Sequence, residues 1–171
     1  MYWFTSDEHF NHENILKLFV YRPFRSVDEM NTTIIQRHNA RVKDNDIVFH
    51  LGDFKLTTKG SNSHEITKQL NGKHIFIAGN HDKNNGCNSP IKYCVINSYG
   101  KTILLIHRPE DAATIISKGG IDLTFCGHVH EKWKFTKTEH GDMVNVGVDQ
   151  WDFYPVDAKQ ILKAYSRWRN D

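Results

Sequence analysis

Short apolar runs that each end in carboxylate, imidazole or amide side chains recur along this 171-residue chain. Runs of this length next to glycine and other turn formers predict buried β-strands. They occupy residues 2–6, 46–51, 74–78, 101–106 and 121–126. Because ligand sites of α/β folds gather at the carboxyl ends of strands, the polar groups that follow the runs are expected to meet. This repeated arrangement constrains the fold more than any other feature of the sequence.

Helical segments alternate with the first strands. Ser26 and Glu29 have capping-box spacing, which predicts the start of a helix that continues to about residue 40. Further helices are predicted over 12–19, 62–70 and 157–168, and a late β pair over 132–138 and 143–148. Early strand–helix alternation followed by strands predicts an α/β domain with mixed sheets. The chain length suits one domain over residues 1–171.

The composition is that of an ordinary soluble protein, with 39% hydrophobic and 25% charged residues. The net charge of +2 does not indicate nucleic acid as a general partner, although it leaves that partner possible. No apolar run reaches about 18 residues, so no membrane span is expected. The start, MYWFTSDEHF, lacks the pattern of a signal peptide, and three scattered cysteines suit a reducing compartment. We therefore expect a cytoplasmic protein.

The residues behind the five runs are of the types that bind transition metals through nitrogen and oxygen. Each alone has an ordinary explanation, since Asp and Asn favour turns and a histidine can be a packed core residue. Together they favour a metal site. The donors are Asp7, His9, Asp53, Asn80, His107, His128 and His130.

Seven donors exceed the needs of one tetrahedral zinc ion and suit two metals that share a carboxylate. Buried carboxylates and imidazoles are costly without compensation, and divalent cations supply it. No cysteine stands among these positions, which argues against a structural zinc site.

The order D-x-H, GD, GNHD, a lone histidine and GHxH resembles the calcineurin-like metallophosphoesterase superfamily. More narrowly, TSDEHFNHENI, YRPF, FHLGDF, AGNHD and NVGVDQW resemble its small single-domain bacterial and phage members. The similarity runs from residue 2 to about 157. It implies the family's four-layer αββα sandwich, in which two mixed β-sheets lie between helical layers.

The resemblance also implies two divalent metal ions, which Mn, Fe, Zn or Ni could supply. It assigns Asp7, His9 and His130 to the first ion, Asn80, His107 and His128 to the second, and Asp53 to both. His81 is implied as the family's catalytic histidine, beside Asp53 and Asn80 in the reacting centre. The second motif departs from a widespread version, because GDFKLTT lacks a further acidic residue after GD. The group that orients His81 is therefore left open.

These residues predict a metal-dependent phosphoesterase. A hydroxide that bridges the two metals would attack phosphorus in line, and His81 would protonate the departing oxygen. The substrate is expected to be a small, nucleotide-like phosphodiester or phosphomonoester. Tentative substrate contacts are His12, Arg22 and Arg108, whereas the remaining histidines are expected to be structural. A nuclease acting on DNA or RNA, and a non-catalytic metal-bearing scaffold, are the alternatives.

Overall fold

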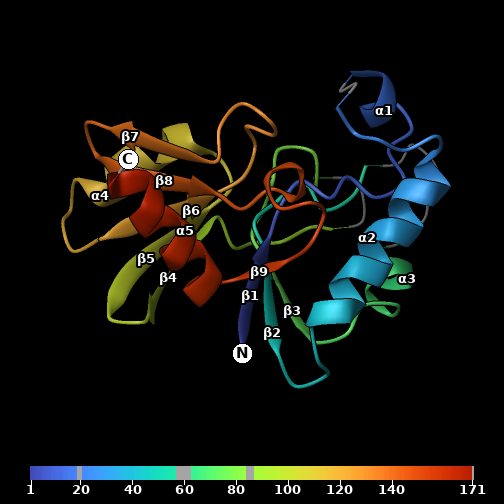
Figure 1. Cartoon of the computed structure of the whole chain (residues 1–171), viewed down its shortest axis with the longest axis horizontal. Coiled ribbons are helices and arrows are strands. Elements are labelled where there is room, and N and C mark those ends of the chain that lie inside the picture. The colour runs from blue at the N-terminus through green and yellow to red at the C-terminus, as the bar shows by residue number, and fades with distance from the viewer. Residues whose placement is uncertain (19–20, 57–62, 84–86, 171) are drawn as a thin grey trace.

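Two mixed β-sheets form the centre of the protein (Figure 1). The computed structural model describes residues 1–18, 21–56, 63–83 and 87–170. The first sheet has the order β3-β2-β1-β9, with β1 (Tyr2–Thr5), β2 (Ile47–His50), β3 (Lys73–Phe76) and β9 (Val156–Asp157). Strands β1 to β3 are parallel, and β9 is antiparallel to β1. The prediction of mixed sheets is confirmed.

The second sheet has the order β4-β5-β6-β8-β7. Its strands are β4 (Tyr93–Ser98), β5 (Lys101–Ile106), β6 (Leu123–Cys126), β7 (Phe135–Thr138) and β8 (Gly141–Asn145). The middle strands β5, β6 and β8 are parallel, and β4 and β7 are antiparallel at the edges. The predicted late β pair is present as β7 and β8. The sequence analysis did not predict β4 or β9.

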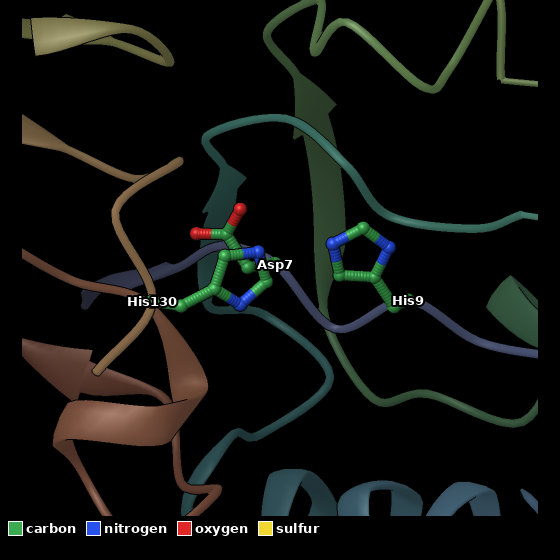
Figure 2. A group of neighbouring side chains, drawn as sticks. All are labelled: Asp7, His9 and His130. Atoms are coloured by element: carbon green, nitrogen blue, oxygen red, sulfur yellow. The ribbon is translucent and has the colours of Figure 1, made fainter. Parts of the chain in front are cut away.

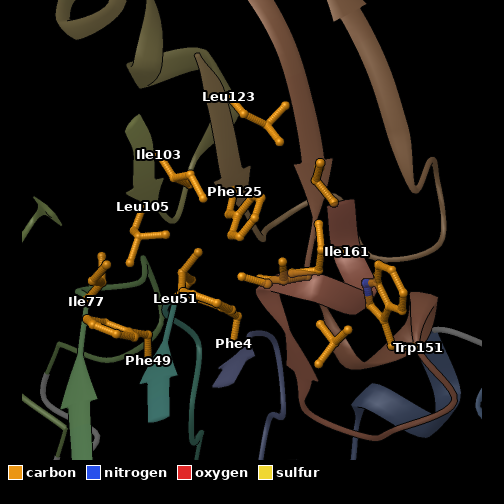
Figure 3. Close-up of a cluster of buried hydrophobic side chains, with 14 residues drawn as sticks. Phe4, Phe49, Leu51, Ile77, Ile103, Leu105, Leu123, Phe125, Trp151 and Ile161 are labelled. Carbon is orange, nitrogen blue, oxygen red and sulfur yellow. The ribbon is translucent and has the colours of Figure 1, made fainter. Parts of the chain in front are cut away.

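The main hydrophobic core lies between the two sheets (Figure 3). Phe4, Phe49 and Leu51 enter it from the first sheet. Leu105 and Phe125 enter it from the second sheet, and the rings of Phe4 and Phe125 meet edge to face with centroids 5.1 Å apart. Because strand side chains alternate, the intervening residues face the outer helices.

Helices α1 (Ile15–Leu18), α2 (Val27–Arg41) and α3 (Ser63–Thr67) lie on the outer side of the first sheet (Figure 1). Ser26 caps α2 as predicted, because its side chain accepts a hydrogen bond from the backbone nitrogen of Glu29 at 3.1 Å. A smaller apolar cluster on the outer face of the second sheet includes Leu104, Ile106 and Met143. The short helix α4 (Ala113–Ile116) packs over this cluster. The helix predicted over 157–168 corresponds to α5 (Ala158–Asn170). This helix packs against the main core.

Loops at the carboxyl ends of the strands are joined directly by backbone hydrogen bonds. The nitrogen of Asp7 donates to the carbonyl of Gly52, and the nitrogen of His9 donates to the carbonyl of Asp53. On the second sheet, the nitrogen of Gly127 donates to the carbonyl of His107. The fold therefore brings the polar groups behind β1, β2, β5 and β6 to one edge. Within the described residues, no helix is long and apolar enough to cross a membrane.

Candidate metal centre

One group of potential metal ligands consists of Asp7, His9 and His130 (Figure 2). Each offers one ligand atom, and these atoms lie within 4.8 Å of one another. All three residues are buried. Asp7 and His9 follow β1, whereas His130 follows β6, so the group joins the two sheets.

A second group consists of Asp53, His107 and His128, whose ligand atoms also lie within 4.8 Å of one another. Asn80 joins this group, because its Oδ1 lies 3.0 Å from Nε2 of His107. All seven predicted donors thus lie in these two groups or beside them. Their division follows the one that the resemblance implies, with Asp7, His9 and His130 on one side.

Asp53 of the second group also faces the first group. Its Oδ2 is 3.8 Å from Nε2 of His9 and 3.4 Å from Nε2 of His107. Burial raises the pKa of Asp53, but the hydrogen bond with His107 and the charge of His107 hold it well below the ordinary value. A carboxylate that favours its ionised form and faces both groups can serve both.

Two imidazoles are oriented through their Nδ1 atoms. Nδ1 of His107 donates to the carbonyl of Leu51 at 2.7 Å, and Nδ1 of His130 donates to Oδ2 of Asp149 at 3.0 Å. In both residues Nε2 is then the nitrogen that can bind a metal. Such a hydrogen bond on the distal nitrogen is the usual support of a metal-binding histidine.

Asp149 is a site residue that the sequence analysis missed. Asp149 forms an ion pair with Arg22. Nε of Arg22 lies 2.9 Å from Oδ1 of Asp149, and Nη2 donates to Oδ2 at 2.9 Å. Neither side chain is exposed to solvent. Nη2 of Arg22 also donates to the carbonyl of Asp7 at 2.8 Å. The prediction that Arg22 contacts substrate is corrected here, because the guanidinium is enclosed in this ion pair. Arg22 instead positions Asp7 and, through Asp149, His130.

The buried Nε2 of His9 has no hydrogen-bond partner within the described ranges of the chain. Burial lowers the pKa of His9 well below its ordinary value, so the ring is neutral. A buried ring nitrogen without a hydrogen-bond partner is costly unless a ligand or an ion meets it. This orphaned atom and the oxygen and nitrogen donors around it fit a divalent transition metal.

His107 shows how strongly the carboxylates favour positive charge at this place. Burial lowers the pKa of His107, but its hydrogen bond with Asp53 and the charges of Asp7 and Asp53 outweigh burial and raise the pKa to about 9. Asp7 has its own pKa raised by burial. The centre thus attracts cations, whether protons or metal ions.

Several ligand residues have left-handed backbone conformations, which non-glycine residues rarely adopt. The positive φ angles are 58° at Asp7, 53° at His9, 53° at Asp53, 72° at His128 and 48° at His130. Asp and His tolerate this region better than most residues, but each such position typically costs about 1–3 kcal/mol. Strain of this kind concentrates at functional sites. The left-handed conformations therefore occur at the residues whose side chains converge on the centre.

Two glycines allow the loops to approach one another. A Cβ atom at Gly79 would overlap the backbone nitrogen of Asp53, and one at Gly127 would overlap the side chain of Ser6. The glycines of the GNHD and GHxH motifs are thus required by close packing behind the ligands.

Asp82 of the GNHD motif binds backbone rather than the ring of His81. Its carboxylate accepts hydrogen bonds from the nitrogens of Asp53, Phe54 and Gly79 at 2.8–2.9 Å. Burial raises its pKa to about 6. Asp82 therefore ties the loop after β2 to the loop after β3, and so positions Asp53.

His81 is exposed and lines a cleft of about 260 Å³ with Asp53, His128 and His130. Its backbone nitrogen donates to Oδ1 of Asp53 at 2.8 Å, and its ring centroid is 5.6 Å from that of His9. His12 lies beside them, with Nδ1 3.4 Å from Nδ1 of His9. The structure thus places His81 at the open side of the centre, and the half-buried His12 lies next to His9.

Arg108 has an exposed side chain that pairs with Glu110 at 2.8 Å. Glu110 also lies 3.8 Å from Nε2 of His128. Arg108 is therefore near the second group, where it is accessible to a ligand, in contrast to Arg22.

A second unpredicted feature is a buried hydrogen-bonded series behind the centre. The carboxyl of Glu8 meets Nδ1 of His50 at 2.6 Å, and Nε2 of His50 meets Nδ1 of His74 at 2.9 Å. Burial raises the pKa of Glu8 to about 8 and lowers that of His50 to about 3. The structure places both histidines away from the ligand groups. The series fastens the backbone between Asp7 and His9 to the first sheet.

A family model for the calcineurin-like phosphoesterase superfamily domain matches residues 4–153. The chain belongs to this superfamily. An uncharacterized protein from Methanocaldococcus jannaschii is 37% identical to it over 170 residues, which cover 96% of this chain and 91% of that protein.

Two solved structures have a similar fold. A protein of unknown function from Aquifex aeolicus has a TM-score of 0.77 and 30% identity, over 96% of this chain and 98% of that one. Vps29 from Entamoeba histolytica, crystallised with Zn²⁺, has a TM-score of 0.50 and 18% identity, over 85% of this chain and 73% of that one. The latter shows a likeness of fold. The narrower resemblance to bacterial and phage members stays a prediction.

Proposed function

We propose that this protein hydrolyses phosphoric esters with a dinuclear metal centre. The observation that carries the proposal is the meeting of two three-residue ligand groups at Asp53, beside an open cleft that His81 lines. A site that only held a structural metal would need neither the second group nor an accessible histidine.

Asp7, His9 and His130 would hold one cation, and Asn80, His107 and His128 the other, with Asp53 between them. When bound, two divalent ions of Mn, Fe, Zn or Ni would neutralise phosphoryl charge and lower the pKa of water from about 15.7 to roughly 7. The protein supplies the geometry. Leu51 and Asp149 fix the imidazoles of His107 and His130, and Asp82 fixes the backbone of Asp53.

His81 would donate a proton to the leaving oxygen. It is exposed to the cleft, and its backbone bond to Asp53 keeps it beside the reacting centre. A general acid must reach the leaving oxygen directly or through one water. The leaving group is therefore expected on the cleft side of the centre, near His81 and His12.

We expect the protein, supplied in turn with Mn, Fe, Zn and Ni, to hydrolyse p-nitrophenyl phosphate, its bis-ester or a cyclic nucleotide. His81→Ala should lower kcat for esters of alkyl or sugar alcohols by about 10²–10⁴-fold. The loss on p-nitrophenyl esters should be much smaller, because p-nitrophenolate leaves without a proton. Steady-state kinetics on both substrate types checks this difference.

His140→Ala is the matched control, since His140 is an exposed histidine in the turn between β7 and β8. It should leave both rates unchanged. Equal losses on both substrate types in His81→Ala would exclude the general-acid role. Failure of the wild type to hydrolyse any of these esters with any of the four metals would contradict the proposed function.

A further inference from the structure

A second hollow of about 510 Å³ adjoins the centre on the side of Asn80 and His107. It lies between the loop after β3, the start of β4 and the end of β5. Tyr93, Ile106 and Ile115 contribute apolar wall, and Lys92, Arg108 and Asp111 contribute polar groups. The volume is within the usual range of small-molecule sites, about 300–1,000 Å³.

His81 lines the 260 Å³ cleft, whereas the larger hollow is lined by Asn80 and His107 and not by His81. A phosphoryl group at the second ligand group would thus have one open space beside the general acid and another away from it. The leaving oxygen must face His81, so a group in the larger hollow cannot be the one that leaves.

We propose that this hollow binds the retained ester group of a phosphodiester, and that this group is a nucleoside or a ring system of similar polarity. The proposal rests on the proposed function. Tyr93, which is 46% exposed, and Ile115 offer apolar contact to a flat ring. Lys92, Arg108 and Asp111 offer hydrogen-bond donors and acceptors to hydroxyl groups and ring heteroatoms.

The chemistry balances without a further reactant. A water oxygen forms a bond to phosphorus and releases one proton, and the bond from phosphorus to the leaving oxygen breaks. The leaving oxygen takes a proton from His81, and the proton released by water returns His81 to its starting state through the solvent. The bond between phosphorus and the retained group stays intact, so the product is a phosphomonoester that still occupies the hollow.

Thymidine 5′-phosphate is the probe for binding, and inorganic phosphate is its control. We expect the manganese-loaded protein to bind the nucleotide at least about tenfold more tightly than phosphate in calorimetric titrations. The variants Lys92→Trp and Ile115→Trp each put a large side chain into the hollow. Either variant should reduce the preference for nucleotide over phosphate to about twofold or less. Because Lys92 is exposed, its variant should fold even if Ile115→Trp does not.

Val95→Trp is the matched control, since Val95 lies two residues beyond Tyr93 on β4, is 44% exposed and does not line the hollow. It should keep the preference. In parallel, both filling variants should lower kcat/KM for thymidine 5′-(p-nitrophenyl phosphate) by about tenfold, whereas Val95→Trp should not lower it.

Equal affinity of the wild type for nucleotide and phosphate would overturn the proposal, as would a preference that both filling variants retain. Failure to hydrolyse any of the esters would count against the proposed function alone, because the binding titrations still decide whether the hollow takes a nucleoside.

Discussion

Asp53→Asn is expected to remove most bound metal and to lower kcat/KM by more than about 10²-fold. Replacing the partners that support metal ligands typically costs about 10–100-fold, so a ligand shared by two ions should cost more. The amide keeps the size of the carboxylate and tolerates the left-handed backbone, with φ of 53°. What it removes is the negative charge that faces Nε2 of His9 and of His107.

Elemental analysis after dialysis against a defined metal concentration checks the prediction for Asp53. Asp44→Asn is the matched control, because Asp44 is an exposed aspartate in the turn before β2. It should keep full metal content and activity. Wild-type metal content in Asp53→Asn would contradict the position of Asp53 between the ions.

Arg22→Met should destabilise the protein by about 3–5 kcal/mol, because it leaves the carboxylate of Asp149 buried without a cation. Both side chains of this pair are fully enclosed, and two nitrogens of Arg22 contact Asp149 at 2.9 Å. Arg108→Met is the matched control, since the side chains of the Arg108–Glu110 pair are 46% and 49% exposed. An exposed pair of this kind contributes about 0–1 kcal/mol.

Urea unfolding in the presence of a chelator measures both variants without a contribution from metal binding. The double variant Arg22→Met/Asp149→Asn should recover part of the loss, because it removes the unpaired charge. If Arg22→Met costs no more than Arg108→Met, the ion pair does not support the centre as we infer.

Much of the fold could be predicted from its apolar runs. Strands β1, β2, β5 and β6 coincide with apolar segments, because most of their residues are buried. Strand β3 is half-buried at the edge of its sheet, and it was predicted from the apolar residues that follow His74. Strand β4 was missed because it is an edge strand that alternates exposed with half-buried residues, from Tyr93 to Ser98. Strand β9 has only two residues, and its pairing with β1 is a tertiary contact.

The candidate ligands could be predicted because they stand immediately behind strands whose ends meet. Residues that act through other residues could not. Asp149 is distant in sequence from both Arg22 and His130, and it looks like an ordinary turn aspartate in NVGVDQW. The sequence suggests Arg22 as a substrate contact because a guanidinium group suits phosphate oxygens. The complete enclosure of Arg22 depends on how the loop after β1 packs, which the sequence does not reveal.

Anomalous diffraction from crystals soaked in Mn²⁺ tests the two-metal account most directly. We predict two peaks, one among Asp7, His9 and His130 and the other among Asn80, His107 and His128, with Asp53 adjacent to both. His130→Ala should mainly lose the first peak, and His128→Ala should mainly lose the second. A single peak in the wild type, or loss of both peaks in each single variant, would contradict the account.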